Sequence, residues 1–322
     1  MAELRRLPRG LAAGLLLLAG LVAVAAAAPL LATDLPWLTT SRGRPASPAI
    51  AAVLAGRPRP TPPTDERVLI RAPIPHGPNQ VDLGATLAPP SGRHWLGTDA
   101  LGRDLAARVV HGARVSLAVG LLAAAFSLLV GVPLGAWAGY RGGWTDTLVS
   151  RTVEAVLCFP TLLLVLAVLT TAAGRLAVLP DPARLALVIG LTGWMPAARY
   201  LRAEFIRLRE SDMVAAARAL GVGDLRIVAR HVLPSAVAPV LVTAAFAVGA
   251  AIGVEAALSF LGLGVRPPHA TWGVLLADSR EYVDRAWWLV LFPGIALFGA
   301  ILACNLLGEG VRDLLDPRSA RR

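Results

Sequence analysis

Long apolar runs separated by short polar segments dominate the pattern of positions along this chain. A bilayer core about 30 Å thick is crossed by roughly 20 apolar residues in helical form. On that criterion the pattern predicts six transmembrane helices, at residues 10–32, 112–139, 153–173, 185–200, 235–258 and 286–307. The fourth is short and interrupted by Gly193 and Pro196, so its limits are the least defined. The expected fold class is an all-α polytopic membrane protein.

The first apolar run has two interpretations. Arg5, Arg6 and Arg9 precede it and "AVAAAAP" lies near its end, a combination typical of a secretory signal peptide. Its uncharged stretch is about 23 residues long, whereas the apolar part of a signal peptide has about 7–15. A retained membrane anchor is therefore favoured over a cleaved peptide.

Arginine placement predicts the orientation in the membrane. Residues 199–231 carry seven arginines, whereas the short loop near Arg175 and Arg184 has few. Because short cytoplasmic loops are enriched in basic residues, residues 205–234 are expected to face the cytoplasm. Six spans then place both termini there, and residues 33–111 outside, since long loops translocate largely regardless of charge.

This topology predicts four parts. They are a cytoplasmic tail with the first span, an extracytoplasmic segment, a five-helix core and a second cytoplasmic tail, at residues 1–32, 33–111, 112–309 and 310–322. Between residues 42 and 90 the outer segment is heavy in proline, as in "GRPRPTPPTDER". Such composition favours extended, poorly packed chain.

Composition agrees with this class and excludes others. Of the 322 residues, 56% are hydrophobic and 16% are charged, which is too apolar for a soluble protein of this size. The net charge of +10 does not indicate a nucleic-acid binder, because the arginines are scattered among apolar runs. The chain contains no lysine, which excludes a Walker-type ATP site and a Schiff-base enzyme. Any ATP is therefore expected to be used by a partner.

Cysteines and histidines form no metal-binding pattern. Cys158 and Cys304 lie within apolar stretches without a CxxC motif, so they are expected to be reduced packing residues. The histidines are scattered, with neither an HExxH motif nor a neighbouring ligand at matching spacing, at His76, His94, His111, His231 and His269. No metal site and no cofactor bound by this chain are expected.

A polar insert, residues 205–234, interrupts the apolar pattern between the fourth and fifth predicted spans. Asp212 fits an N-cap and residues 213–220 are strong helix formers. Gly221 or Gly223 can supply the left-handed turn that ends a helix.

A second short helix is predicted at residues 224–232, ahead of Pro234. Periodicity alone leaves two interpretations of this helix-turn-helix open. It is either an interfacial amphipathic helix in a re-entry loop, or a helix held by another protein.

Individual residues of the insert carry a resemblance. Ala216, Ala217 and Gly221, followed by "HVLP" ending at Pro234, resemble the EAA loop of ABC importer permeases, whose short cytoplasmic helix seats in a groove of the ATPase subunit. Three longer stretches resemble the C-type permease of the dipeptide, oligopeptide and nickel ABC importers. They are "LGTDALGRDLAARVVHGARVSLAVG", "EAALSFLGLGVRPPHATWG" and "NLLGEGVRDLLDPR". The resemblance covers residues 96–318 in matching order and spacing.

The resemblance implies a six-helix type I permease subunit in a bacterial or archaeal cell membrane. Its implied partners are a homologous second permease, two ATPase subunits that use ATP and Mg, an extracytoplasmic solute-binding protein and membrane lipid. Selection lies largely with the binding protein in this family, so the cargo stays open among dipeptides, oligopeptides, a nickel chelate and glutathione.

Two competing hypotheses need patterns that the sequence does not show. A secondary transporter driven by an ion gradient predicts an inverted repeat and midplane carboxylates. A membrane enzyme using Asp99 and Asp104 predicts converging catalytic groups at recognisable spacing.

The resemblance also assigns an ATPase-coupling role, to Glu210, Asp212, Ala215, Ala216, Ala217, Arg218, Gly221, His231 and Pro234. One position departs from the family, because Ala215 stands six residues before Gly221, where a glutamate is usual. Glu210 or Asp212 is expected to supply the missing carboxylate to an arginine of the ATPase.

Candidates for the pathway or for helix interfaces are Glu154, Pro160, Trp194 and Glu255. For Glu154 an i,i+3 ion pair with Arg151 is the plainer explanation. Glu255 either lines the pathway or reaches the outer interface.

The "GTDALGRD" motif has two interpretations as well. Thr98 or Asp99 caps a short helix, with Arg103 and Asp104 solvated. Alternatively the motif contacts the solute-binding protein through Asp99, Arg103 and Asp104, together with Trp272.

Overall fold

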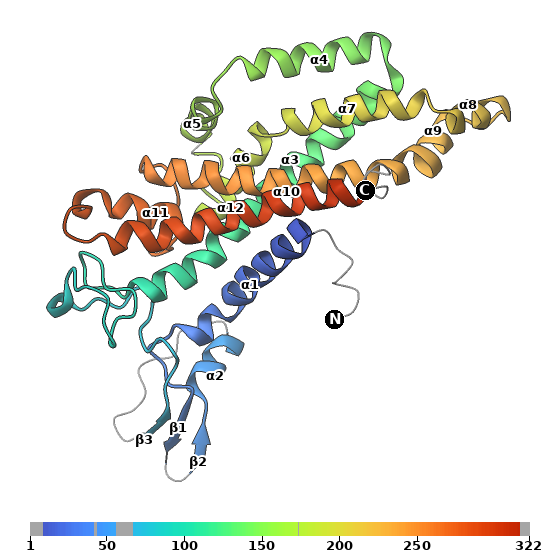
Figure 1. Ribbon diagram of the computed structural model, residues 1–322. Helices are drawn as coiled ribbons and strands as arrows, with labels where there is room; N and C mark the ends of the chain where they lie inside the picture. The colour runs from blue at the N-terminus through green and yellow to red at the C-terminus, as the bar shows by residue number, and fades with distance from the viewer. Residues whose placement is uncertain (1–8, 42–43, 56–66, 173, 316–322) are drawn as a thin grey trace. The chain divides into compact units, whose positions relative to one another are not determined.

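The computed structural model describes residues 9–41, 44–55, 67–172 and 174–315 (Figure 1). The chain divides into two compact units. Unit 1 contains Met1–Leu18, Val119–Glu255 and Ala300–Arg322, and unit 2 contains Ala19–Ala118 and Ala256–Gly299. Several long helices contribute residues to both units, namely α1 (Arg9–Leu31), α3 (Leu105–Arg141), α10 (Leu233–Phe260) and α12 (Trp288–Leu315).

Four helical stretches of the described chain are long and apolar enough to cross a membrane: Arg9–Leu31, Leu105–Arg141, Asp224–Phe260 and Trp288–Leu314. They contain the predicted first, second, fifth and sixth spans, apart from a residue or two at some ends. Continuous apolar helices suit a bilayer because all their backbone hydrogen bonds are made within the segment. The polytopic, helical fold class is confirmed.

The predicted third span is not one continuous helix. α4 (Gly143–Leu157) and α5 (Thr161–Thr171) meet at a bend of 92°, which makes them a broken span or a re-entrant loop. The bend falls at Pro160, which lacks a backbone N–H and disfavours the helical conformation of the residue before it. Counting this pair as one span gives five.

The predicted fourth span is divided too. α6 (Asp181–Thr192) ends at Gly193, and α7 (Met195–Arg209) begins with Pro196 in its first turn. Neither reaches the length of a full membrane span. A total of six spans is therefore not confirmed within the described residues.

The segment after α1 contains a small sheet that the sequence pattern missed. Strands β1 (Leu38–Ser41), β2 (Arg44–Ala46) and β3 (Arg67–Ile70) pair antiparallel in the order β2-β1-β3, and the short helix α2 (Pro48–Ala55) follows β2. β2 and β3 are extended, as predicted for residues 42–90, but they pair with β1 in a sheet, and composition alone did not indicate this pairing. Most of the "GRPRPTPPTDER" stretch lies outside the described residues.

In unit 1, α3 and α7 approach each other through a row of glycines. Cβ atoms added to Gly131, Gly135 and Gly139 would lie 2.7, 2.4 and 2.4 Å from the carbonyl oxygens of Trp194, Ala198 and Arg202, respectively. Glycines four residues apart share one helix face, and this spacing brings two helix backbones into contact. The two helices are held at backbone distance along this row.

Candidate functional site

The polar insert forms the helix-turn-helix that its sequence predicts (Figure 1). α8 (Asp212–Ala219) is followed by α9 (Asp224–Ile227), and a π-helical turn, η3 (Val228–Val232), joins α9 to α10. The N-cap of α8 is Ser211, with extended backbone, and Asp212 is its first helical residue. The expectation that Asp212 caps the helix is off by one residue.

Gly221 ends α8 in the manner expected from sequence. Its φ is +75°, and its N–H donates to the carbonyl of Arg218 at 2.9 Å. The next N–H, of Val222, donates to the carbonyl of Ala217 at 3.1 Å. This pair of bonds is a Schellman motif, which favours glycine at the left-handed position. Gly223 has a φ of −67° and is not the stop signal.

One face of α8 is anchored inside unit 1. Val214 and Ala217, three residues apart, are buried in a hydrophobic cluster with Leu201, Phe205 and Ile227. Ala217 therefore packs inward, and its predicted contact with a partner does not fit this orientation.

The opposite face of α8 is exposed and nearly featureless. At 3.6 residues per turn, Asp212, Ala215, Ala216 and Ala219 lie away from Val214 and Ala217. All four are exposed. This stretch, called here the alanine face, presents mainly methyl groups to a partner, because Ala215 stands where a long acidic side chain is usual.

Arg218 takes part in a polar link between α3, α8 and α9. The Tyr140 hydroxyl donates to Asp224 Oδ1 at 2.8 Å and accepts from Arg218 Nη2 at 3.4 Å. Arg218 Nε lies 3.5 Å from Asp224 Oδ1, and its guanidinium lies 5.6 Å from the centre of the Tyr140 ring. The hydrogen bond to Tyr140 raises the pKa of Arg218. Arg218 is thus held by contacts with Tyr140 and Asp224, and its side chain is still exposed to solvent.

The two carboxylates near the alanine face are accessible. Glu210, just after α7, is exposed and lies 3.4 Å from the guanidinium of Arg209, while Asp212 is exposed in the first turn of α8. His231 is half-buried in η3, and Pro234 is exposed at the start of α10. The replacement of the missing glutamate by Glu210 or Asp212 stays a prediction.

The remaining candidates of unit 1 differ in burial and in contacts. Glu154 forms the expected i,i+3 ion pair with Arg151, at 2.8 Å on the surface. Pro160 is exposed at the bend, and Trp194 packs against a cluster that includes Val153 and Met195. Glu255 is fully buried, so its side chain does not reach the outer interface.

Cys158 differs from its prediction. It is exposed rather than packed, whereas Cys304 is buried as expected. Both are free thiols.

A cavity of about 470 Å³ lies within unit 1. Its lining is mostly apolar and comes from α3, α6, α7, α10 and neighbouring segments, with polar groups from Ser127, Thr192, Tyr200, Thr243 and Arg312. Glu255 is not among the lining residues, although its neighbour Val254 is.

In unit 2 the "GTDALGRD" motif takes part in a charge network in which Asp99 and Arg108 are buried and Asp278 is exposed. Asp99 Oδ2 accepts from Arg103 Nε at 2.7 Å and from Arg108 Nη1 at 2.5 Å. Arg108 Nη1 also donates to Asp278 Oδ2 at 3.2 Å. Sequence reasoning missed Arg108 and Asp278, because the partners are 170 residues apart; an arginine at the start of an apolar helix was the available signal.

Asp104, rather than Thr98 or Asp99, caps the helix that follows, because its Oδ1 accepts from the N–H of Ala107 at 2.8 Å. Asp99 and Asp104 are both buried, so the expectation of a solvated Asp104 was wrong. Trp272, in α11 (Trp272–Asp278), is buried as well, and its indole N–H donates to the carbonyl of Val109 at 3.1 Å. Of the four residues predicted to contact a binding protein, Arg103 is the most accessible.

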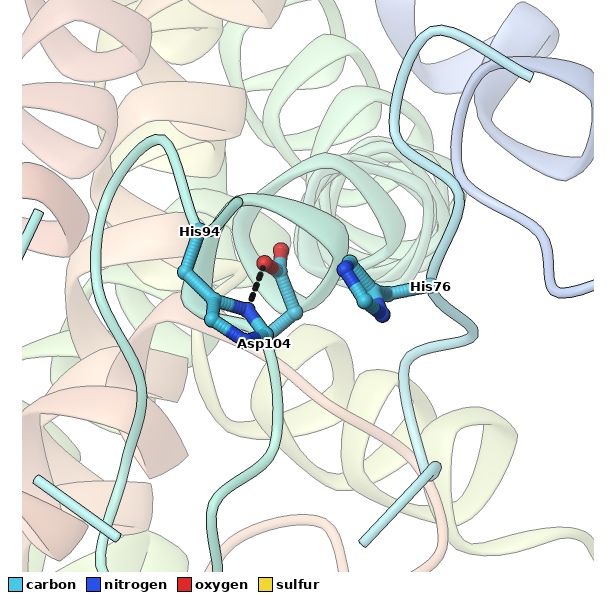
Figure 2. A group of neighbouring side chains, drawn as sticks. All are labelled: His76, His94 and Asp104. Atoms are coloured by element: carbon cyan, nitrogen blue, oxygen red, sulfur yellow. Dashed lines mark hydrogen bonds and ion pairs between the residues drawn. The ribbon is translucent and has the colours of Figure 1, made fainter. Parts of the chain in front are cut away.

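Unit 2 also contains a side-chain cluster that the sequence spacing did not reveal. Figure 2 shows His94 and Asp104 joined by a hydrogen bond, with His76 approaching from a separate loop. One potential ligand atom from each of the three lies within 4.8 Å of the others. Sequence spacing did not indicate that His76, His94 and Asp104 lie together. They are brought together by loops without regular periodicity.

The apolar helices and the anchored polar insert define a multi-pass membrane permease. The family described as "Binding-protein-dependent transport system inner membrane component" matches residues 131–321, more than half of the chain. The chain belongs to this family, and it is a permease subunit of an ABC importer that works with ATPase and binding-protein partners.

Three relatives named for peptide transport each match 71% or more of this chain. A Brucella suis protein of a peptide transport system is 45% identical over 244 residues, 75% of this chain and 79% of the relative. The dipeptide transport system permease DppC of Alkalihalophilus pseudofirmus is 42% identical, over 71% of this chain and 73% of its own length. The di/tripeptide transport system permease DppC of Pseudomonas aeruginosa is 39% identical, over 76% of this chain and 80% of its own.

A solved structure of the MetNI methionine ABC transporter has the same fold. Its TM-score is 0.53 at 16% identity, over 67% of this chain and 97% of the matched chain. At that identity the likeness shows the fold alone. Family, relatives and fold together favour the ABC importer over the secondary-transporter hypothesis.

Proposed function

We propose that this chain imports short peptides as one of two homologous permease subunits, together with two ATPase subunits and an extracytoplasmic solute-binding protein. The peptide cargo is supported by relatives assigned to peptide, dipeptide and di/tripeptide transport. ATP and Mg are used by the ATPase subunits in this proposal, and no cofactor is assigned to this chain.

The geometry of α8 is the observation that carries the coupling role. Val214 and Ala217 fix one side of the helix in the core, and the alanine face is left exposed on the other. A groove can approach a methyl-covered helix closely, so groove closure moves the helix as a rigid body.

Motion of α8 reaches the membrane helices by two routes. The hydrophobic cluster joins α8 to α7, and the glycine row holds α7 against α3 at backbone distance. The link of Tyr140, Arg218 and Asp224 joins α8 and α9 to the end of α3. Close packing transmits displacement because protein interiors have few voids to absorb it.

Cross-linking tests this proposal directly. In a Cys158→Ser background, Ala216→Cys is expected to cross-link to a cysteine placed in the groove of the co-expressed ATPase. Ala217→Cys is the matched control, because the side chain of Ala217 is buried although it is next to Ala216 in the chain. Equal cross-linking at the two positions, or none at Ala216→Cys in an assembled complex, would contradict the docking of the alanine face.

Orientation is the second part of the proposal. We place the polar insert and both termini in the cytoplasm and residues 33–111 outside, on the positive-inside rule. Leu225, in α9, and Val178, between α5 and α6, have exposed side chains suited to cysteine labelling. In intact cells Val178→Cys is expected to react with an impermeant maleimide, and Leu225→Cys only after permeabilisation. The reverse pattern would remove the coupling role of α8.

The binding-protein contact stays a proposal as well. A cavity of about 420 Å³ in unit 2 is lined by charged side chains of both signs, including Arg103, Asp278, Arg280 and Glu281. The buried carboxylate of Asp99 holds Arg103 at this cavity by accepting a hydrogen bond from its Nε. We assign the contact to the charged side chains that line this cavity, with buried Asp99 positioning Arg103. Asp104 is buried and bonded to His94, so it does not touch the partner in this proposal.

A further inference from the structure

We propose that His76 and His94 bind a transition-metal ion of the zinc class, with Asp104 orienting His94. All three residues belong to unit 2, and the proposal is independent of the solute that the transporter carries. It rests on a nitrogen that is buried without a partner, on the hydrogen bonds that set which ring nitrogen of each histidine carries the proton, and on the chemistry of the donor atoms.

The unpartnered nitrogen is Nε2 of His94. The residue is 4% exposed, and its Nε2 has no hydrogen-bond partner among the described residues. Leaving a buried polar atom unsatisfied costs about 1–3 kcal/mol, so such an atom calls for a ligand. A metal ion coordinated by the Nε2 lone pair removes that cost.

Asp104 sets the tautomer of His94. Its Oδ2 lies 2.9 Å from Nδ1 of His94, and its Oδ1 accepts from the backbone N–H of Ala107 at 2.8 Å (Figure 2). An ionised carboxylate only accepts hydrogen bonds, so Nδ1 carries the proton, and in the neutral ring that binds a metal Nε2 keeps its lone pair. Metal-binding histidines characteristically donate the other ring N–H to a carboxylate or to a backbone carbonyl.

His76 follows the second of these two patterns. Its Nε2 lies 3.3 Å from the carbonyl oxygen of Arg93. Because a carbonyl only accepts, Nε2 carries the proton and Nδ1 keeps its lone pair. Each histidine thus has one protonated nitrogen held by the chain and one nitrogen available to a metal.

The rings must adjust before they share an ion. They are stacked, with centres 4.6 Å apart and planes at 27°, and the three potential ligand atoms span up to 4.8 Å. Two nitrogens on a tetrahedral Zn²⁺, at about 2.05 Å each, lie about 3.3 Å apart. His94 is fixed by Asp104 and by burial, whereas His76 is half-buried, so a turn of the His76 ring closes the difference.

Nitrogen donors with a supporting carboxylate favour Zn²⁺ over Mg²⁺ or Ca²⁺, which prefer oxygen. Asp104 uses both oxygens for its hydrogen bonds, and water completes the coordination in this proposal. The ion would join the loop that carries His76 to the beginning of α3.

Metal titration of the full chain tests the site. The protein is purified through a histidine-free affinity tag, stripped with a chelator and titrated with Zn²⁺ by calorimetry, with Mg²⁺ in parallel. One Zn²⁺ per chain is expected, and no Mg²⁺ at the same concentrations. His76→Ala is expected to lower Zn²⁺ affinity at least about tenfold, and Asp104→Asn about 10- to 100-fold. His269→Ala, which removes an exposed histidine of the same unit, is the control and should bind as the parent does.

Because His94→Ala exposes a cavity in the core and can unfold the unit, His94 is tested by spectroscopy instead. Cu²⁺ bound to the parent protein should show electron-nuclear coupling to two imidazoles, and Cu²⁺ bound to His76→Ala should show coupling to one. Absence of stoichiometric Zn²⁺ binding would overturn the proposal. So would an affinity unchanged in His76→Ala, or a coupling pattern without imidazole.

Discussion

Gly135 offers a sharp test of how α3 and α7 are held together. A Cβ at this position would lie 2.4 Å from the carbonyl oxygen of Ala198, 3.0 Å from its Cα and 3.1 Å from its carbonyl carbon. All three atoms belong to backbone, so none can rotate away. Restoring an ordinary contact of about 3.4 Å requires the helices to separate locally by about 1 Å.

The expected cost of Gly135→Ala follows from that displacement. Overpacking by one methyl group typically costs about 1–3 kcal/mol. Alanine recovers about 0.5–1 kcal/mol through its higher helix propensity. The net destabilisation is up to about 2.5 kcal/mol, which corresponds to a fall of up to about 10 °C in the unfolding midpoint at about 2–4 °C per kcal/mol.

Gly253→Ala is the matched control. This glycine also lies within an apolar helix of unit 1, and its added Cβ would meet only Ile301 Cδ1, at 3.8 Å. Alanine should therefore be neutral or stabilising there, by up to about 1 kcal/mol.

Thermal unfolding in detergent, followed by tryptophan fluorescence, measures both variants, and peptide uptake by reconstituted complexes measures coupling. Gly135→Ala is expected to lower both the unfolding midpoint and the uptake. Equal midpoints for Gly135→Ala and Gly253→Ala would refute the backbone contact between α3 and α7.

Three further predictions concern the polar insert. Tyr140→Phe removes the hydroxyl that links α3 to α8 and α9, a loss of about 0.5–1.5 kcal/mol, and is expected to lower uptake per ATP hydrolysed while the complex still assembles; unchanged coupling would dismiss the link as a transmission element. Gly221→Ala places a side chain at a φ of +75°, at a cost of about 1–2 kcal/mol, and is expected to reduce uptake. Gly223→Ala is the control and should not reduce uptake, because the φ of Gly223 is −67°. Identical uptake in these two variants would contradict the left-handed turn. Reversing Glu210 and Asp212 together to arginine should weaken ATPase binding by about 1–3 kcal/mol in co-purification, and normal assembly would remove only the idea that they replace the missing glutamate.

Apolar periodicity and short motifs were sufficient to predict the class of this protein. A long uncharged run has few alternatives to a membrane helix, and this is why four spans could be located from sequence. The ends of α8 were also readable, because a left-handed glycine and a preceding polar cap are local signals. The family resemblance required residues at fixed spacing within continuous stretches, which sequence displays directly.

Features that depend on residues far apart needed the tertiary structure. The side of α8 that packs inward was decided by Val214 and Ala217 meeting α7 and α9, and helix periodicity alone did not distinguish Ala217 from the exposed Ala216. Arg108 donates to both Asp99 and Asp278, and a contact with a residue 170 positions away is not visible in a sequence pattern.

The same reason applies to the histidines and to the broken spans. His76, His94 and Asp104 lie on irregular loops, whose course is set by contacts rather than by a repeating pattern, so their spacing carried no metal signal. A proline such as Pro160 within an apolar run is compatible with a gentle bend as well as with the 92° turn observed, so the sequence did not locate the break. Sequence thus determined what is locally encoded, namely the apolar helices and the signals at their ends. Three-dimensional packing decided which helix faces are covered, which charges meet and where a helix breaks, because these features depend on contacts with residues distant in the chain.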